Sequence, residues 1–319
     1  MPRIVIPDDA PPVMAPSAAY RTLLDREAVG YHASLPAGEA GLIERIAGAA
    51  VVINIRSSTR FTDGVFRQSP HLRLLSLWGT GTDNVDLAAA AHHGVTVTNT
   101  PGVSAFSIAE HALALMLATA RRIPRVDTEI RLGHWPRGQA VQMYGKTLGI
   151  VGLGAVGRQF ARLGAGIGMR VIAWTMHPNP ALGFELVSLD ELLGSSDVVS
   201  LHLRLSSETR GFIGKSEIEK MKLSAILINT ARGAIVDEQA LLDALASNQI
   251  AGAGLDVFDA EPLPNGHPLT RLDNVVLTPH SAGVTPEALE AGLKLSIENV
   301  WNFLDGHPTN VVVNGNGVR

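Results

Sequence analysis

The sequence predicts an α/β fold with two doubly wound parallel sheets, and two observations carry this prediction. First, short apolar runs alternate with amphipathic or alanine-rich segments of helical length along the whole chain. Strand, helix and strand repeated in this way are typical of a parallel sheet that helices cover on both faces. Second, the apolar runs are too many for one sheet of ordinary size, so we expect two sheets.

The expected elements follow one another in a regular order. At 319 residues the chain is long enough for two domains with full cores. Helix-length segments such as residues 105–122, 158–164 and 238–247 lie between the apolar runs. The expected strands are residues 3–6, 51–55, 72–77, 95–98, 148–151, 170–174, 198–203, 225–228, 252–255 and 275–277.

Two breaks in this pattern divide the chain. Asn99-Thr100-Pro101-Gly102 is a turn-forming run before a long helix, and a run of small residues over 281–286 precedes a helix that reaches about residue 304. We therefore expect one domain of residues 1–98 and 285–319, interrupted by a second domain of residues 99–284. The two crossing segments are expected to form a hinge over a cleft, which is a common place for a substrate.

Composition excludes several classes of function. The net charge is −4 and aromatic residues are 5% of the chain, so neither nucleic acid nor a membrane surface is an expected partner. The apolar stretches fall far below the ~18 residues of a membrane span, and the N-terminus does not look like a signal peptide. The absence of cysteine excludes disulfides, thiolate catalysis and cysteine-ligated zinc. It fits a cytoplasmic location, and we assign no metal site.

A glycine-rich turn follows the expected strand at 148–151. Its sequence is Gly152-Leu153-Gly154-Ala155-Val156-Gly157, and a helix is expected to begin near Arg158. The first glycine permits a tight turn, the second lets the backbone approach a pyrophosphate, and the third lets the helix pack on the strand. The turn therefore indicates a dinucleotide-binding Rossmann domain, with a packing turn as the alternative. The similar run at 164–168 comes after the helix, and we interpret it as a loop.

The next strand, 170–174, ends without the acidic residue that usually binds the adenosine ribose. Thr175 occupies that position, and His177 follows shortly after. A carboxylate repels a 2′-phosphate and a threonine does not, so the sequence does not select against NADP. His177 can supply part of a positive attraction.

Five motifs occur in order along the chain. They are Gly79-Thr80-Gly81-Thr82-Asp83-Asn84-Val85-Asp86, the glycine turn, Asn229-Thr230-Ala231-Arg232-Gly233 with Val236-Asp237-Glu238, Gly254-Leu255-Asp256-Val257-Phe258 with Glu261-Pro262, and Thr278-Pro279-His280 with Ala282-Gly283. With these motifs in this order, the sequence resembles the D-isomer-specific 2-hydroxyacid dehydrogenases over nearly the whole length of the chain. The resemblance implies a Rossmann cofactor domain inserted into a flavodoxin-like substrate domain, which agrees with the division above.

Three residues within these motifs fit hydride transfer to a 2-keto acid. Arg232 follows a buried strand, at the sheet edge where α/β proteins bind ligands, and a guanidinium can hold a carboxylate with two hydrogen bonds. His280 follows the strand at 275–277 and suits a proton donor near neutral pH. Glu261 can fix the tautomer of a histidine and favour the imidazolium. With the family motif around each, Arg232, Glu261 and His280 are the expected catalytic set.

The resemblance also implies binding residues. The backbone of Trp78, Gly79, Thr80 and Gly81 is expected to receive the substrate carboxylate, because glycine leaves bare N–H groups accessible to an anion. Other histidines, such as His111 and His202, are interpreted as structural or solvent-facing. The expected cofactor contacts are Ser107, Gly152, Gly154, Ala155, Val156, Gly157, Thr175, His177, Leu203, Arg204, Thr230, Ala231, Asp256, His280, Ala282 and Gly283, with a capping role as the alternative for Asp256.

Two departures from the family pattern bear on specificity. Arg204 stands where the family usually has proline, and it can stack on adenine or meet a 2′-phosphate. The cofactor is therefore NAD or NADP, with a lean toward NADP tolerance. Leu77 stands where phosphoglycerate-type members tend to carry arginine, and the chain ends at Arg319 without room for a regulatory domain. We expect a small unphosphorylated 2-keto acid such as glyoxylate or hydroxypyruvate.

Alternatives to this activity remain open. Arg56 and Arg60 keep a D-3-phosphoglycerate substrate possible, whereas Glu261 argues against formate dehydrogenase activity, since those relatives replace this residue. Some proteins of this fold act as dinucleotide-sensing binding proteins or corepressors. The complete set of arginine, glutamate and histidine favours an enzyme, because a pure binding protein need not keep it.

The helix expected at 105–122 predicts a homodimer. A helix that is apolar on nearly every face is buried all round, and one domain can cover only part of it. In the family this region packs against a second subunit, and burial between the two domains of one chain is the alternative. The apolar residues are Ile108, Ala109, Ala112, Leu113, Leu115, Met116 and Leu117.

Overall fold

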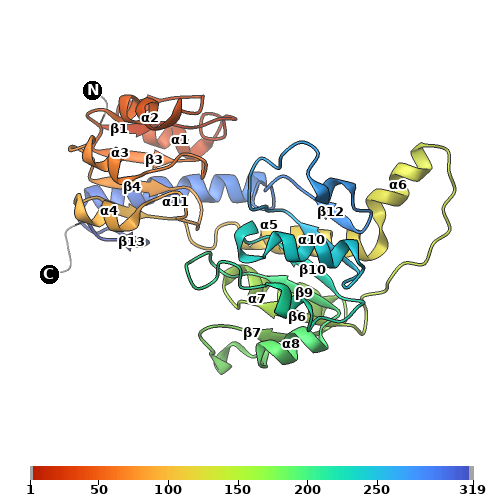
Figure 1. Ribbon diagram of the computed structural model, residues 1–319. Helices are drawn as coiled ribbons and strands as arrows, with labels where there is room; N and C mark the ends of the chain where they lie inside the picture. The colour runs from red at the N-terminus through yellow and green to blue at the C-terminus, as the bar shows by residue number, and fades with distance from the viewer. Residues whose placement is uncertain (1–2, 316–319) are drawn as a thin grey trace. The chain divides into compact units, whose positions relative to one another are not determined.

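The computed structural model describes residues 3–315. The chain folds as two compact units, of which the first holds the chain up to Ser104 and from Thr285 onward, and the second holds Ala105–Val284. Each unit contains one β-sheet with helices against it (Figure 1). The prediction of an α/β fold with two sheets is confirmed.

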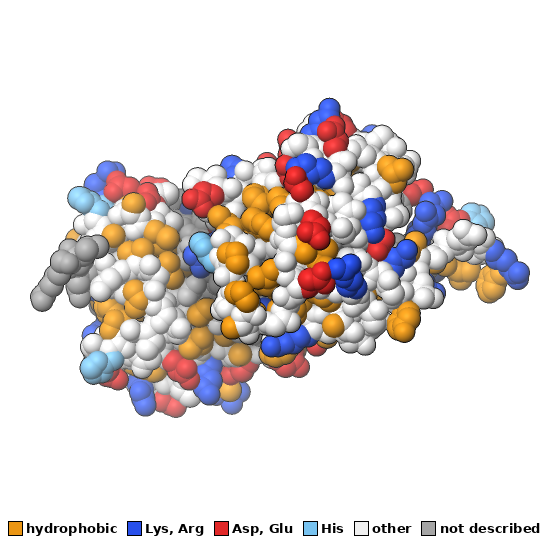
Figure 2. All heavy atoms as spheres, turned by 90° about the horizontal axis from the view of Figure 1, so that it is seen from below, with side chains coloured by type: hydrophobic (Ala, Val, Ile, Leu, Met, Phe, Trp, Pro, Cys, Tyr) orange, Lys and Arg blue, Asp and Glu red, His pale blue; other side chains and the backbone are white. Residues whose placement is uncertain are grey.

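The surface carries charges of both signs. On the face shown in Figure 2, acidic and basic side chains are interspersed, with apolar side chains between them. Within residues 3–315, no helix combines the length and the apolar character needed to cross a bilayer.

The sheet of the first unit has the strand order β13-β5-β4-β3-β1-β2. β1 to β5 pair in parallel, and β13 joins β5 in the antiparallel sense. The order β2-β1-β3-β4-β5 is that of a flavodoxin-like sheet, as predicted. The strands are β1 (Ile4–Ile6), β2 (Val29–Tyr31), β3 (Val51–Asn54), β4 (Leu74–Leu77), β5 (Thr96–Thr98) and β13 (Val311–Val313).

Helices of the first unit pack on its sheet through two apolar clusters. One cluster includes Leu42 and Phe66, and the other includes Leu23 and Ile297. Full burial of side chains of this size contributes roughly 1.5–3 kcal/mol each. The helices are α1 (Ala18–Leu24), α2 (Gly38–Ile46), α3 (Asp63–Arg67), α4 (Leu87–His92) and α11 (Pro286–Leu304).

The sheet of the second unit is parallel throughout, with the order β12-β11-β10-β9-β6-β7-β8. The chain runs outward from β6 to β8 and then returns to the other side of β6 at β9. This reversal is the switch point at which Rossmann-type sheets bind ligands. The strands are β6 (Thr147–Val151), β7 (Arg170–Trp174), β8 (Glu185–Leu186), β9 (Val198–Leu201), β10 (Ile226–Asn229), β11 (Gly252–Leu255) and β12 (Val275–Leu277).

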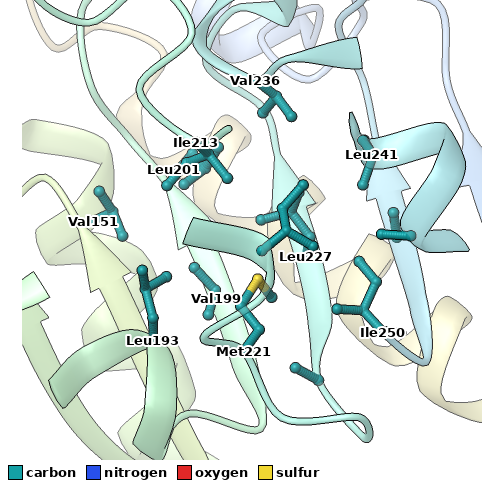
Figure 3. Close-up of a cluster of buried hydrophobic side chains, with 14 of the residues drawn as sticks. Val151, Leu193, Val199, Leu201, Ile213, Met221, Leu227, Val236, Leu241 and Ile250 are labelled. Atoms are coloured by element: carbon teal, nitrogen blue, oxygen red, sulfur yellow. The ribbon is translucent and has the colours of Figure 1, made fainter. Parts of the chain in front are cut away.

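Helices cover both faces of this second sheet. Figure 3 shows the core on one face, where Val199 and Leu227 of the sheet meet Leu193 and Leu241 of the covering helices. On the other face, Leu115 and Phe160 belong to a separate core cluster. The helices are α5 (Ala105–Arg121), α6 (Ile123–Arg131), α7 (Ala155–Gly166), α8 (Leu189–Ser195), α9 (Lys215–Ile218) and α10 (Glu238–Ala246), with single 3-10 turns at Pro180–Leu182, Gly233–Ile235 and Pro268–Arg271.

All ten expected strands are present, but several boundaries differ. β2, β8, β13 and α6 were not expected, and β9 ends at Leu201, so Leu203 lies in the following loop. α7 begins at Ala155 rather than near Arg158 and continues through Gly166, so the prediction of a loop from residue 164 is wrong. A Cβ atom at Gly164 would overlap Leu148 of β6, which explains why this helix position is glycine.

The helix at 105–122 is expected to be covered only in part by its own domain, with a second subunit over the rest. Only one face of α5 is buried within the chain, and it includes Ala109, Leu115 and Met116. Phe106 is 66% exposed on the helix. The helix packs on β10, β11 and α7, which cover one side only.

Candidate active site

Two glycines of the turn after β6 are required by packing. Gly152 has a φ of 104°, and a Cβ atom there would lie 2.7 Å from the carbonyl oxygen of His202. A Cβ atom at Gly157 would overlap the carbonyl oxygen of Gly152. These contacts bring the first turn of α7 against β6 and the loop after β9, as the sequence pattern predicts.

Gly154 has a different environment. A Cβ atom there would meet no atom within 4 Å, so packing within the chain does not require glycine at this position. Gly154 precedes the 12-residue helix α7 without a side-chain cap, and the N–H groups of Ala155 and Val156 lie in the first turn. Open space in front of an uncapped helix N-terminus fits the pyrophosphate of a dinucleotide.

The expected adenosine contacts lie at the same sheet edge, on either side of this turn. Thr175 follows β7 and is half-buried, whereas His177 is exposed. Leu203 packs against the glycine turn, with its Cδ2 atom 3.0 Å from the position of a Cβ at Gly152, and Arg204 beside it is exposed. Because β7 and β9 both neighbour β6, the two segments flank the glycine turn.

His202 supports the turn from within the chain. Its Nε2 atom is 2.9 Å from the hydroxyl of Ser200, and its ring meets Phe160 of α7 edge to face. Part of the residue reaches solvent, but burial of the imidazole lowers the pKa of His202 to about 3. The ring is therefore neutral near pH 7.

The loop after β10 is held in place by Asn229. Its Oδ1 accepts the N–H of Ala231 at 3.0 Å, and its Nδ2 donates to the carbonyl oxygen of Arg232 at 2.9 Å. A Cβ atom at Gly233 would overlap the backbone of Phe258, so glycine lets this loop approach the loop after β11. Asn229 was quoted within a motif but not expected to have this role.

Thr230 offers a hydroxyl group at this loop. The residue is 7% exposed, and its Oγ1 has no hydrogen-bond partner among residues 3–315. An unpaired buried hydroxyl is costly, so a bound ligand that pairs with it gains affinity. The position fits the contact to the nicotinamide ribose that the resemblance implies.

His280 and Glu261 form a direct pair. The Nδ1 atom of His280 is 2.7 Å from Oε2 of Glu261, and the Oε1 atom of Glu261 accepts the N–H of Phe258 at 3.0 Å. A proton on Nδ1 that points at the carboxylate leaves Nε2 directed elsewhere. Both side chains are about one-third exposed, so the pair is open to a ligand.

Charges around Glu261 keep it ionised. Burial raises its pKa, but the hydrogen bond and charge of His280, the N–H of Phe258 and the charge of Arg232 together hold the pKa of Glu261 below its usual value. The Nη1 atom of Arg232 donates to the carbonyl oxygen of Ala231 at 2.8 Å. The three expected catalytic residues therefore share one electrostatic environment in the second unit.

Asp256 holds the turn that carries His280. It is fully buried, its Oδ1 accepts the hydroxyl of Thr278 at 2.7 Å and the N–H of Ser281 at 2.9 Å, and its Oδ2 accepts the N–H of Ala282 at 2.9 Å. Burial raises the pKa of Asp256, but bonds from His111, Thr278 and these N–H groups outweigh burial and lower it. The structure thus gives Asp256 a local organising role.

His111 was interpreted as structural or solvent-facing, and the structure places it in this polar group. Its Nε2 atom is 2.9 Å from the hydroxyl of Thr278. The sequence held no spacing signal for this contact, because it depends on how α5 crosses the ends of β11 and β12. The remaining expected cofactor contacts are Ser107, half-buried on α5, buried Ala282 and half-buried Gly283.

The expected carboxylate-binding loop lies in the first unit, and two of its N–H groups are occupied. Trp78 N–H donates to the carbonyl oxygen of Asn54 at 2.9 Å, and Gly79 N–H donates to Oγ1 of Thr100 at 2.7 Å. Among residues 3–315, no hydrogen bond is found for the N–H groups of Thr80 and Gly81. These two N–H groups are the donors that the loop can offer to an anion.

Hydrogen bonds hold the same loop against the chain segment after β5. Thr100 N–H donates to the carbonyl oxygen of Gly79 at 3.0 Å, and Asn99 Nδ2 donates to the carbonyl oxygen of Thr80 at 2.8 Å. The indole of Trp78 lies against Gly292 of α11, where a Cβ atom would overlap the ring nitrogen. The conformation of the loop is therefore fixed within its own unit.

The guanidinium of Arg56 is held by contacts within the first unit. It lies 3.9 Å from the buried carboxylate of Asp9 and donates to the carbonyl oxygen of Pro11. Arg60 is exposed. Of the two arginines that keep a phosphorylated substrate open, one is held by an internal carboxylate.

Comparisons with known proteins identify the family of this chain. Residues 113–282 match the model of the D-isomer specific 2-hydroxyacid dehydrogenase NAD binding domain. A glyoxylate reductase from Korarchaeum cryptofilum is 40% identical over 288 residues, which cover 87% of this chain and 86% of that protein. A solved acyclic imino acid reductase in complex with NADPH and D-Arg is 30% identical, with a TM-score of 0.90 over 97% of this chain and 100% of that chain.

A longer relative shows the same likeness over part of its length. A D-3-phosphoglycerate dehydrogenase from Archaeoglobus fulgidus is 41% identical over 269 residues, which are 82% of this chain but 51% of that protein. The chain therefore spans about half the length of this relative. From the family match and these identities, the chain belongs to the D-isomer specific 2-hydroxyacid dehydrogenases, and residues 113–282 form their NAD-binding domain.

Proposed function

We propose that the protein uses a nicotinamide cofactor to interconvert a small 2-keto acid and the corresponding D-2-hydroxy acid. The observation that carries the proposal is the distance of 2.7 Å between Nδ1 of His280 and Oε2 of Glu261. The positive charge of Arg232 acts on the same carboxylate. Arg232, Glu261 and His280 follow β10, β11 and β12, which are neighbours in the sheet. Parallel strands place their carboxyl ends at one edge, where ligands bind.

Each residue has a distinct task in the proposed reduction. When bound, the nicotinamide supplies the hydride. Nε2 of His280 donates a proton to the carbonyl oxygen of the substrate, and Glu261 holds the ring by its Nδ1–H and stabilises the imidazolium. Arg232 holds the substrate carboxylate and polarises the ketone.

The glycine turn and the loop after β10 are proposed to hold the cofactor. The open space at Gly154 and the uncapped start of α7 suit the pyrophosphate, and the unpaired hydroxyl of Thr230 suits a ribose hydroxyl. Ala155 and Val156 contribute N–H groups at the start of the helix. Asp256 is proposed to accept a hydrogen bond from the carboxamide on the nicotinamide side.

We propose that the substrate of this site carries no phosphate group. Arg56 is held by Asp9 and by the carbonyl oxygen of Pro11, which leaves its guanidinium little freedom to bind a phosphate. Leu77 is buried within β4 and offers no charge. The relatives of both names are about equally similar to this chain, with 40% identity for the glyoxylate reductase and 41% for the D-3-phosphoglycerate dehydrogenase, so the proposal rests on the residues of the site.

We further propose that the pocket accepts NADPH as well as NADH. Thr175 brings no negative charge to the end of β7, and exposed His177 and Arg204 flank the glycine turn with groups that can meet a 2′-phosphate. A solved relative with a TM-score of 0.90 contains NADPH.

A homodimer is proposed from the apolar surface that α5 and α6 leave uncovered. α6 has no buried residue, and α6 with the following segment stands away from the sheet of its own unit (Figure 1). Sedimentation at micromolar concentration tests this proposal, and a monomer mass would reject it. Phe106 is exposed at the start of α5, and further exposed apolar side chains follow along α6 and the segment after it: Ile123, Val126, Ile130, Leu132, Trp135, Val141 and Tyr144.

One experiment tests the proposed activity and its alternatives together. The purified protein is assayed for loss of NADH and of NADPH absorbance with glyoxylate, hydroxypyruvate, pyruvate and 3-phosphohydroxypyruvate. Turnover of the unphosphorylated acids supports the proposal. Preference for 3-phosphohydroxypyruvate would indicate a phosphoglycerate dehydrogenase, and cofactor binding without any turnover would indicate a dinucleotide-sensing binding protein.

A further inference from the structure

A chain of hydrogen bonds runs from α5 to the turn after β12. The Nε2 atom of His111 is 2.9 Å from Oγ1 of Thr278 and 3.5 Å from Oδ1 of Asp256. The hydroxyl of Thr278 donates to Oδ1 of Asp256 at 2.7 Å. Because the hydroxyl proton is used in that bond, the oxygen accepts a proton from His111, which therefore carries it on Nε2. Each bond in such a chain polarises the next.

Asp256 connects this chain of hydrogen bonds to the turn that carries His280. Its carboxylate accepts the N–H groups of Ser281 and Ala282, each at 2.9 Å, and its carbonyl oxygen accepts the N–H of His280 at 2.7 Å. His280 has a φ of 51°, in the left-handed region that residues with a Cβ rarely occupy. Such a conformation persists only where the surrounding contacts hold it.

We infer that His111 is a positioning residue for His280. It orients the hydroxyl of Thr278 and so keeps the carboxylate of Asp256 on the turn that holds His280 beside Glu261. His111 acts through Thr278 and Asp256 and does not itself touch the substrate. The role of His280 as proton donor belongs to the proposed function, on which this inference rests.

Because of the position of His111, its effect on the turn can be tested separately from an effect on the stability of the whole fold. The imidazole is partly exposed, with 24% of its side-chain surface accessible, so its replacement leaves no large cavity. Removal of its N–H deprives the Thr278 hydroxyl of its donor beside a fully buried carboxylate. Thr278 is half-buried, and the loss of a hydrogen bond to its hydroxyl beside that carboxylate has a cost that the turn can relieve by opening.

A matched control lies on the same helix. Thr119 is two turns further along α5, and its hydroxyl lies 3.5 Å from the carbonyl oxygen of Ala253 in β11. The same hydroxyl donates to the carbonyl oxygen of Leu115 at 2.8 Å, so Thr119→Val removes a polar contact within α5 together with the one to β11, away from the turn at His280. His111→Leu removes the donor, and His111→Gln keeps a donor on a side chain of similar reach.

Hydrogen exchange in the cofactor-free protein provides the first measurement. In His111→Leu, the amides of residues 280–282 should exchange about tenfold faster than in wild type, since the bonds to Asp256 that protect them open more often. His111→Gln should restore most of the protection, and Thr119→Val should leave this segment unchanged. Equal protection in wild type and His111→Leu would overturn the inference.

Steady-state kinetics provide the second measurement. His111→Leu should lower kcat by about tenfold to a hundredfold, because a small displacement of a catalytic group is costly, while the KM for the keto acid changes little. His111→Gln should recover most of the rate. A fall in kcat that Thr119→Val reproduces, or that His111→Gln fails to recover, would assign His111 to general stability instead.

The two measurements separate failure of this inference from failure of the proposed function. If wild type reduces no 2-keto acid but His111→Leu still exposes the amides of residues 280–282, the proposed activity is wrong and His111 still organises the turn. If wild type is active and His111→Leu matches it in rate and in exchange, only the positioning role is wrong.

Discussion

The Nδ1 atom of His280 lies 2.7 Å from Oε2 of Glu261, and both residues are in loops that follow adjacent parallel strands. The hydrogen bond and the neighbouring charges hold the pKa of Glu261 below its usual value despite partial burial. The contribution of this carboxylate to stability is therefore fully present above the ordinary pKa of a glutamate, and it is lost as the pH falls through the lowered pKa.

Glu261→Gln should change the pH dependence of the reaction. The variant removes the anion that faces the ring of His280, so the proton-donating form of the ring loses its stabilising partner. The alkaline limb of kcat/KM for keto-acid reduction should move to lower pH. Asp259→Asn, which neutralises an exposed carboxylate two residues away, should leave the profile in place. An unmoved limb in Glu261→Gln would contradict the pairing.

His280→Ala and Arg232→Ala should impair different steps. In the proposed mechanism His280 supplies a proton in the transition state, so its loss should lower kcat by ~10²–10⁴ with a smaller effect on KM. Arg232 is proposed to hold the keto acid in both the ground and the transition state, so KM should rise as well in Arg232→Ala. Steady-state kinetics at neutral pH distinguish the two. Near-normal kcat in His280→Ala would remove its assignment as proton donor.

Much of the fold was predictable from sequence because its signals are local. Buried parallel strands such as β6 and β10 are continuous apolar runs. The glycine turn indicates that two backbone segments approach each other closely. Two of the missed strands lack such a signal. β8 has two residues at the edge of its sheet, and β2 contains Gly30 between partly exposed neighbours. Their pairing depends on the strand beside them rather than on their own composition.

The candidate site was predictable to the extent that its residues sit in motifs at strand ends. His280 and Glu261 were expected as a pair, and the structure places them in contact. The partners of Gly79 were not predictable, because they depend on how separate segments meet. The glycine suggested a bare N–H group, but Thr100, which is 21 residues away in sequence, occupies it. The contact of His111 with Thr278 spans 167 residues and likewise has no local signal.

Thr100→Val tests the support of the loop that is expected to bind the substrate carboxylate. Loss of the hydroxyl leaves the N–H of Gly79 without its acceptor, at a cost of about 1–3 kcal/mol that the loop can relieve by moving. The KM for the keto acid should rise severalfold while the Kd for NADH stays constant, and Thr100→Ser should behave like wild type. Fluorescence titration and steady-state kinetics give the two constants.

Thr98→Val provides the matched control for that prediction. The hydroxyl of Thr98 is buried in β5 and has no hydrogen-bond partner among the described residues, so a methyl group in its place should leave stability unchanged or higher. Its KM for the keto acid should equal that of wild type. If Thr100→Val also leaves KM unchanged, the bond to Gly79 does not set the loop conformation that binds the carboxylate.

Thr175→Asp should shift the cofactor preference toward NADH. The new carboxylate can accept the ribose hydroxyls of NADH and repels a 2′-phosphate, since two like charges ~4 Å apart cost about 1 kcal/mol in water and several times more in a partly buried site. NADPH use should fall at least ~tenfold, while NADH use holds or improves. Arg204→Pro should act in the same direction by removing a cation. The measurement is kcat/KM for both cofactors. An unchanged ratio in both variants would place the selectivity elsewhere, with His177 as the next residue to replace.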